Sequence, residues 1–124
     1  MKILIVEDEE ILSKVLEEKF KRANFDTEIA VTGDAAFPIA KKFSPDVILL
    51  DLILPKKTGF DVLKEIKSDA DLKTVPVIVL SNLGQDEEIK KALELGASDY
   101  MVKTQHPINE VIEKVKNLLL KKSR

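Results

Sequence analysis

The sequence predicts an α/β protein built on a doubly wound parallel sheet of five strands, with five helices covering its two faces. Short apolar runs recur along the chain without strict polar alternation, which is typical of strands buried on both faces. Segments with helical spacing separate these runs and are long enough for the crossovers that parallel strands require. A length of 124 residues suits a single domain with one core.

Each element has its own signal in the sequence. The runs predicted to be strands are Ile3 to Val6, Val47 to Leu50, Val77 to Leu80, Tyr100 to Val102 and, less clearly, Thr27 to Ala30. The helices are predicted from stripes at helical spacing: Ile11, Val15, Leu16 and Phe20; Ala36, Ile39, Ala40 and Phe43; Phe60, Leu63, Ile66 and Lys67; Ile89, Leu93 and Leu95; and Ile108, Val111, Ile112, Val115 and Leu119. Pro38 falls inside the second stripe, where its missing N–H predicts a kink or a late helix start.

Composition excludes several classes of protein. The hydrophobic fraction of 44% and charged fraction of 34% argue against disorder. The chain has no cysteine, which excludes disulfides, thiolate metal sites and a cysteine nucleophile. A net charge of −2 does not suit a nucleic-acid-binding domain, and the apolar runs are too short to cross a bilayer. We expect a soluble, cytoplasmic protein that contacts neither nucleic acid directly nor a membrane.

Polar side chains follow four of the predicted strands. Glu7 and Asp8 follow the first run, Asp51 follows Val47 to Leu50, Ser81 follows the next run, and Lys103 follows the last. Taken singly, such residues are most often solvated turn or helix-capping residues. Ligands of open α/β sheets bind beyond the carboxyl ends of the strands. The five side chains are therefore expected to meet in one crevice.

The residue types point to phosphoryl chemistry. Crowded carboxylates raise one another's pKa and normally need a cation. Oxygen ligands without cysteine favour Mg²⁺ or Mn²⁺, which also neutralises phosphoryl oxygens. Lys103 suits a second phosphoryl oxygen and Ser81 can donate a hydrogen bond to a third. Asp51 then remains as the nucleophile, forming an acyl phosphate.

At this point the whole chain resembles the receiver domains of two-component response regulators. The residues that carry the resemblance are Ile3 to Glu9, Pro45 to Pro55, Thr58 to Leu63, Pro76 to Ser81 and Gly96 to Lys103. The resemblance implies a flavodoxin-like sheet with strand order 2-1-3-4-5. We interpret residues 1–124 as a stand-alone receiver domain, although a piece cut from a longer regulator remains open.

The resemblance also assigns roles. It implies that Asp51 is the phosphoacceptor, with Ser81 and Lys103 binding the phosphoryl oxygens. Asp8 is implied as a direct ligand of Mg²⁺ or Mn²⁺ and Glu7 as a ligand through water. Asp51 is implied as a further ligand of the cation, and one more ligand from the protein completes the set.

That further ligand, by resemblance, is the backbone carbonyl of Ile53, and Tyr100 is the aromatic switch that turns inward when Ser81 moves. The phosphodonor would be a phosphohistidine on a sensor histidine kinase or phosphotransfer protein. A downstream target protein would read the fourth helix, fifth strand and fifth helix. Such a domain is not an enzyme acting on a separate substrate, because it catalyses only its own phosphorylation and dephosphorylation.

Some residues depart from the family pattern. Asn82 stands where a small residue is common, and Lys56-Lys57 place positive charge near the site. Thr104 follows Lys103 in place of the usual proline. A cis bond before a non-proline residue costs about 3–4 kcal/mol, so a trans bond is predicted, with Lys103 still reaching Asp51. The single histidine, His106, is expected in a surface loop.

Three other functions fit the sequence less well. A pseudo-receiver that binds partners without phosphorylation is disfavoured by the complete set of site residues, although Asn82 and Thr104 leave room for it. An aspartate-nucleophile phosphatase needs a second aspartate where this chain has Ile53. A flavin-binding relative would need a phosphate loop where Glu7 to Glu10 would repel a phosphate.

Overall fold

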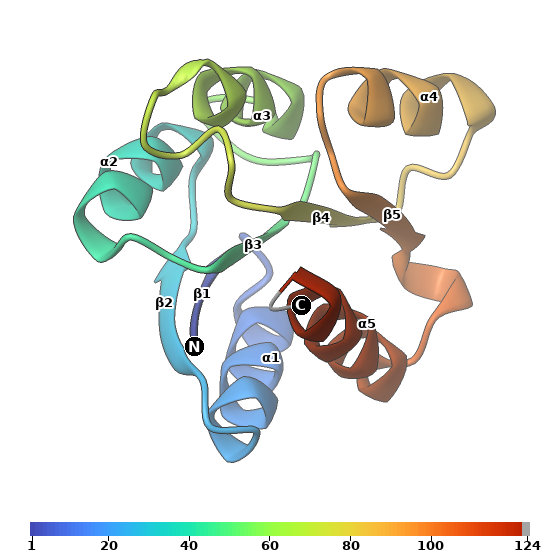
Figure 1. Cartoon of the computed structure of the whole chain (residues 1–124). Helices are drawn as coiled ribbons and strands as arrows, with labels where there is room; N and C mark the ends of the chain where they lie inside the picture. The colour runs from blue at the N-terminus through green and yellow to red at the C-terminus, as the bar shows by residue number, and fades with distance from the viewer. Residues whose placement is uncertain (123–124) are drawn as a thin grey trace.

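The computed structural model describes residues 1–122 and contains five strands that alternate with five helices (Figure 1). A short 3₁₀ turn, Lys103–Gln105, precedes the last helix. The elements in chain order are β1 (Lys2–Val6), α1 (Glu10–Arg22), β2 (Asp26–Ala30), α2 (Gly33–Phe43), β3 (Val47–Leu50), α3 (Gly59–Ser68), β4 (Val77–Ser81), α4 (Asp86–Glu94), β5 (Asp99–Val102) and α5 (Ile108–Lys122).

The strands form one parallel sheet in the order β2-β1-β3-β4-β5, which confirms the predicted architecture. Its register brings the strand ends to one level. Val6 lies opposite Leu50, and Leu50 lies opposite Val79. At the other side of β4, Ser81 lies opposite Val102. The residues that follow β1, β3 and β5 therefore leave the sheet at the same edge as the last residue of β4.

Alternate residues of each strand point into two separate cores. Helices α2, α3 and α4 cover one face of the sheet, and α1 and α5 cover the other (Figure 1). Along β1, Leu4 and Val6 join the first core, which lies under α2, α3 and α4. Ile3 and Ile5 join the second core, which lies under α1 and α5. Because both faces are covered, all four positions are buried, which explains why the strand reads as an unbroken apolar run.

The predicted inner face of α1 is wrong at one position. Leu16 and Phe20 are buried against the sheet, but Ile11 is 82% exposed. Ile11 precedes Leu16 by five residues, which places it about 140° around the helix from Leu16. Its spacing from Val15 suggested a shared stripe, but the residues of the first turn that pack inward are Leu12 and Ser13, on the side of the helix that carries Leu16.

Helix α2 runs through Pro38 without a late start. The helix begins at Gly33 and continues to Phe43, so that alternative of the prediction is wrong. Pro38 lies on the exposed side of the helix. The backbone carbonyl that loses its hydrogen-bond donor belongs to Asp34, which is also exposed, so water can satisfy it.

Helix α4 is the most lightly packed of the helices whose side chains are described. Ala92 is its only fully buried residue, and Leu93, predicted to face the core, is 46% exposed. Ala92 is the neighbour that turns toward the sheet in its place. A cation–π contact ties α4 to α3, with the Lys91 ammonium 4.3 Å from the centre of the Phe60 ring. Within residues 1–122, none of the helices combines the length and apolar character that a bilayer crossing requires.

Two positions on α1, one buried and one exposed, give a matched test of the burial pattern. Replacing Leu16, which is 1% exposed, with alanine should lower the free energy of unfolding by about 2–5 kcal/mol, because it leaves a cavity in the second core. Ile11→Ala on the same helix should change it by less than about 0.5 kcal/mol. Urea unfolding measures both. Equal losses would mean that the Ile11 side chain also packs against the rest of the protein.

Candidate functional site

Four strand ends deliver the candidate site residues to one edge of the sheet. Glu7 follows β1, Asp51 follows β3, Ser81 ends β4 and Lys103 follows β5. The parallel ladder extends one residue beyond β1 and β3. The Glu7 N–H donates to the Ala30 carbonyl at 3.0 Å, and the Asp51 N–H donates to the Val6 carbonyl at 3.0 Å. Both acidic residues therefore start from backbone positions fixed by the sheet.

Three carboxylates meet at this edge, as the sequence predicted. One carboxylate oxygen each from Glu7, Asp8 and Asp51 lies within 4.8 Å of the others. Glu7 and Asp51 are buried, with only 2% and 5% of their surface exposed, whereas Asp8 is exposed. The cluster thus has an inner wall of two buried acids and an open side at Asp8.

The Lys103 ammonium lies between the two buried carboxylates. Its Nζ is 2.6 Å from Oε1 of Glu7 and 3.0 Å from Oδ2 of Asp51. A third carboxylate, that of Glu9, is 3.8 Å from the same Nζ. Glu9 was not singled out in the sequence, where it read as a helix-start acid. One ammonium therefore offsets part of the negative charge of several acids.

The Lys103–Thr104 bond is trans, and the described residues contain no cis peptide bond, which confirms the prediction. The chain enters the 3₁₀ turn Lys103–Gln105 directly after β5. The lysine side chain nevertheless reaches Asp51, as expected. A cis bond after Lys103 is therefore not needed to place its ammonium beside Asp51.

Burial and charge shift the pKa of these groups. Burial raises the pKa of Glu7 to about 7, the hydrogen bond from Lys103 opposes the rise, and the Asp51 charge adds to it. Burial alone would lower the pKa of Lys103, but its hydrogen bonds to Glu7 and Asp51 outweigh that effect and raise it. The lysine thus stays charged over the physiological range, and Glu7 titrates within that range.

Ser81 and Tyr100 meet at the loop between β4 and α4. Ser81 is fully buried, and its Oγ accepts a hydrogen bond from the Leu83 N–H at 3.4 Å. The Tyr100 hydroxyl donates to the Leu83 carbonyl. Both side chains predicted to form the switch therefore contact the backbone of one residue. Sequence reasoning could not find Leu83, because it takes part through backbone atoms.

The loop between β3 and α3 carries Asp51 and Ile53. The Ile53 N–H donates to Oδ1 of Asp51 at 3.2 Å, and the Ile53 side chain is 54% exposed. Gly59 closes the loop, donating its N–H to the Leu52 carbonyl at 2.9 Å. A Cβ atom at position 59 would lie 2.3 Å from the Asp51 carbonyl oxygen, so only glycine fits there. The role of the Ile53 carbonyl as a ligand stays a prediction.

Other residues noted in the sequence have different surroundings. Asn82 is exposed beside the site. Lys57 forms an ion pair with Glu65 on α3, with Nζ 2.9 Å from Oε1, so its charge is engaged in the scaffold. His106 lies in the connection before α5, with Nδ1 2.8 Å from Oε2 of Glu110. The expectation that His106 belongs to a loop is confirmed.

The residues present fit a hard divalent cation. Oxygens on opposite sides of one Mg²⁺ are about 4 Å apart, close to the spacing of the three carboxylates. Lys103 offsets one negative charge, which leaves the cluster net negative. A bound cation would neutralise phosphoryl oxygens and make the phosphorus more electrophilic. Binding at pH 7 would also displace the proton that Glu7 partly retains.

The fold and this group of side chains are those of a signalling domain rather than of an enzyme with a separate substrate. The family model of the response regulator receiver domain matches residues 3–116. The chain therefore belongs to that family and is a receiver domain of a two-component system.

Individual relatives agree with this assignment. The alkaline phosphatase synthesis transcriptional regulatory protein PhoP of Bacillus subtilis is 38% identical over 120 residues, which cover 95% of this chain and 48% of that protein. The receiver domain of the Francisella response regulator 1452 superposes with a TM-score of 0.88 at 30% identity, covering 99% and 98% of the two chains. The Mn²⁺-bound form of response regulator Rcp1 superposes with a TM-score of 0.79 at 32% identity, covering 94% and 90%. The chain spans about half the length of the curated relatives it matches.

Tyr100 allows a direct optical test of this part of the site. It is the only tyrosine in a chain without tryptophan, so the phenolate absorbance reports on it alone. Burial, with smaller contributions from the Glu88 and Asp51 charges, raises its pKa to about 12. We expect a midpoint near 12 in the folded protein and near the ordinary value of 10.0 in concentrated urea.

The sign of the linked stability follows from that shift. Between about pH 10 and pH 12 the folded state keeps a proton that the unfolded state loses. Tyr100 therefore stabilises the fold below pH 10, and this contribution is lost as the pH rises through 12. Tyr100→Phe serves as the blank. A midpoint near 10 in the folded protein would show that the ring is solvated and the hydroxyl is not held by Leu83.

Proposed function

We propose that this receiver domain accepts a phosphoryl group on Asp51 from a phosphohistidine donor in a Mg²⁺-dependent reaction. One observation supports the choice of Asp51 above all others. Its buried carboxylate contacts the Lys103 ammonium at 3.0 Å and belongs to the carboxylate cluster at the open edge of the sheet. Glu7 shares these properties but lies deeper, with 2% of its surface exposed against 5% for Asp51.

The chemistry proposed for Asp51 is an in-line displacement. A carboxylate oxygen of Asp51 attacks the phosphorus of the phosphoimidazole, the P–O bond forms, and the P–N bond breaks. The electron pair of that bond goes to the leaving imidazole. Lys103 contacts Asp51 already, so it needs only to pivot toward a phosphoryl oxygen to stabilise the added negative charge.

The other residues of the site have supporting roles in this proposal. Asp8 and Asp51 hold the cation directly, Glu7 holds it through water, and the Ile53 carbonyl completes the protein ligands. The Mn²⁺-bound form of response regulator Rcp1 supports a divalent cation in this family. The Ser81 hydroxyl donates to the phosphoryl group.

A shift of Ser81 toward the phosphoryl group is the first step of the proposed signal. Ser81 and Tyr100 both bond to Leu83, so movement of Ser81 alters the loop before α4. The proposed output surface consists of α4, β5 and α5, to which a downstream target protein binds. The phosphodonor is a sensor histidine kinase or a phosphotransfer protein.

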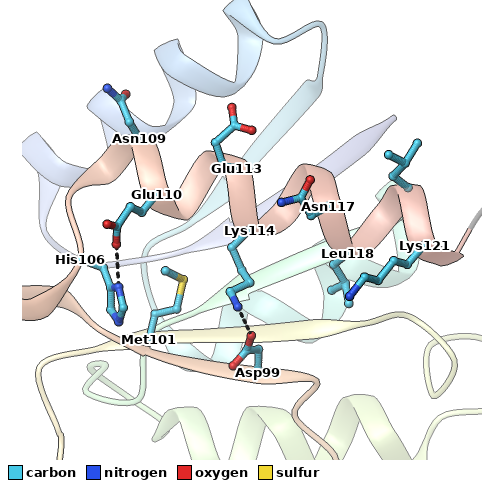
Figure 2. Close-up of a pocket in the computed structure, with 11 residues that line it drawn as sticks. Asp99, Met101, His106, Asn109, Glu110, Glu113, Lys114, Asn117, Leu118 and Lys121 are labelled. Carbon is cyan, nitrogen blue, oxygen red and sulfur yellow. Dashed lines mark hydrogen bonds and ion pairs between the residues drawn. The ribbon is translucent and has the colours of Figure 1, made fainter.

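The surface between β5 and α5 is hollowed in a way that suits a partner. An open groove of about 780 Å³ lies there, with Met101 and Leu118 among its lining residues (Figure 2). Two ion pairs lie along it, because Lys114 lies 2.9 Å from Asp99 and His106 lies against Glu110. Binding a target there would cover the apolar surface of Met101 and Leu118 and would also meet two existing ion pairs.

Relatives of about twice this length are named as transcriptional regulators, one of them as DNA-binding. Binding of DNA is said of those proteins. For residues 1–124, with a net charge of −2, we propose only the phosphoacceptor and protein-binding roles.

The acceptor residue can be tested by chemical phosphorylation. After incubation with acetyl phosphate and Mg²⁺, the intact protein should gain the mass of one phosphoryl group, and Asp51→Asn should not, because an amide is a poor nucleophile. Asp61→Asn is the matched control, since Asp61 is an exposed aspartate on α3 that lies outside the site. Undiminished labelling of Asp51→Asn with an unchanged circular dichroism spectrum would place the phosphoacceptor elsewhere.

Metal binding can be tested by thermal unfolding. A ligand at 100 times its Kd adds about 2.7 kcal/mol to the unfolding free energy, so Mg²⁺ should raise the Tm of the wild type measurably. Asp8→Asn should lose most of that rise. Asp8 is exposed and Lys103 already offsets its two neighbours, so the gain in metal-free stability should be below about 1 kcal/mol.

The control for this test is Glu10→Gln, which removes an exposed acid two residues away that pairs with Lys14. It should keep the full Mg²⁺-dependent rise in Tm. Equal rises in wild type and Asp8→Asn would contradict the assignment of Asp8 as a direct ligand.

A further inference from the structure

Two glycines, each the first residue of a helix, lie against the loop that follows Asp51. Gly59 begins α3 and contacts the loop at Asp51 and Leu52, as described above. Gly33 begins α2, which follows β2 at the edge of the sheet, and contacts the loop farther along. The second contact joins the acceptor loop to a part of the chain that supplies no side chain to the site.

The contact at Gly33 is too close for any side chain. Its N–H donates a hydrogen bond to the Pro55 carbonyl at 3.0 Å. A Cβ atom at position 33 would lie 1.9 Å from the Lys57 carbonyl oxygen and 2.6 Å from its carbonyl carbon. The obstructing atoms belong to the backbone, so they cannot rotate away as a flexible side chain would. Either the loop or the start of α2 would have to move.

The part of the loop that Gly33 contacts is strained. The Lys57 N–H also donates to the Pro55 carbonyl, at 2.9 Å, which closes a three-residue turn around Lys56. Lys56 has a φ of 75°, a left-handed conformation that a lysine adopts only at a cost. Such a conformation persists only where its surroundings hold it. The hydrogen bond from Gly33 to the same carbonyl is one such restraint.

This turn lies next to the residue predicted to complete the metal site. Ile53 precedes Pro55 by two residues and donates its N–H to Oδ1 of Asp51. The short segment from Asp51 to Pro55 is thus fixed at one end by β3 and at the other by Gly33. A displacement of the turn would therefore be transmitted to the backbone of Ile53.

We propose that Gly33 is a positioning residue for the metal site, holding the turn around Lys56 and, through it, the backbone of Ile53. The inference rests on the proposed function, because it presumes that a divalent cation binds beside Asp51. Gly33 itself touches neither the cation nor the phosphoryl group. Its effect is exerted through the acceptor loop.

The test is a Mg²⁺ titration of Gly33→Ala in which amide chemical shifts are the readout. The titration is run well below the Tm of the variant. We expect the Kd for Mg²⁺ to rise about tenfold or more, the range found when residues that support metal ligands are changed. The metal-free spectrum should change at residues 53–57. Gly84→Ala is the matched control, because its Cβ would come no closer than 3.3 Å to a neighbouring atom, a methyl group of Val102. It should bind Mg²⁺ within about twofold of the wild type.

The same glycine substitution can be made in a Lys56→Gly variant, in case Gly33→Ala alone does not fold. Lys56→Gly accepts a left-handed φ without strain, so the loop can yield to a new Cβ at position 33. The double variant should therefore fold, and its Kd for Mg²⁺ should again exceed that of Lys56→Gly by about tenfold. If the double variant folds better than Gly33→Ala but binds Mg²⁺ no more tightly, Gly33 positions the metal site and does not merely support the fold.

Two negative results would have different meanings. A wild type that binds no Mg²⁺ would overturn the proposed metal site, and the role of Gly33 with it. A wild type that binds Mg²⁺ while Gly33→Ala, or the double variant against Lys56→Gly, binds it equally well would overturn the positioning role alone. Shift changes confined to α2 would accompany that second result.

Discussion

Two buried carboxylates at neighbouring strand ends impose the main constraint on this molecule. Glu7 and Asp51 are almost fully removed from water, and like charges so placed would oppose folding if nothing compensated them. The Lys103 ammonium does so, within 2.6 Å of one and 3.0 Å of the other. It can do so only if β5 is in the same sheet as β1 and β3 and ends at the same edge. The compensation of charge at the site therefore depends on the strand order of the sheet.

The same edge is rigid where Asp51 lies. Asp51 continues the hydrogen-bond ladder of the sheet, and the loop behind it rests on the starts of two helices through Gly33 and Gly59. Neither glycine has a chemical function of its own. Both permit backbone to approach backbone more closely than any side chain would allow, which fixes the direction in which the Asp51 carboxylate leaves the sheet.

Sequence reasoning located the parts of the site that depend on side-chain type and strand ends. The positions after each apolar run brought Glu7, Asp51, Ser81 and Lys103 together, because parallel strands end at one edge. The strand order itself came from the family resemblance and not from periodicity. Ile11 was misassigned because a four-residue spacing is ambiguous at a helix end: Leu12 and Ser13 are the residues of the first turn that pack inward, and Ile11 faces solvent.

Contacts made by backbone atoms left no signal in the composition or spacing. The Leu83 carbonyl receives the Tyr100 hydroxyl, and the Pro55 carbonyl receives two amides, one of them from Gly33, but neither acceptor depends on its own side chain. The contact between the Glu9 carboxylate and Lys103 joins two side chains but was also missed, since only the three-dimensional arrangement distinguishes Glu9 from the other acids near the start of α1. Such contacts are consequences of tertiary structure.

The light packing of α4 gives the domain a compliant element beside a stiff one. With Ala92 as its only fully buried residue, α4 would expose little apolar surface if it shifted on the sheet, so its displacement costs a small part of the global stability. The contact between Lys91 and Phe60 adds a restraint of about 0.5–1 kcal/mol at an exposed site. A phosphoryl group on Asp51, as proposed above, would therefore not have to deform the sheet to act at a distance. A shift of α4, which buries a single residue, would be enough to change the surface of the domain.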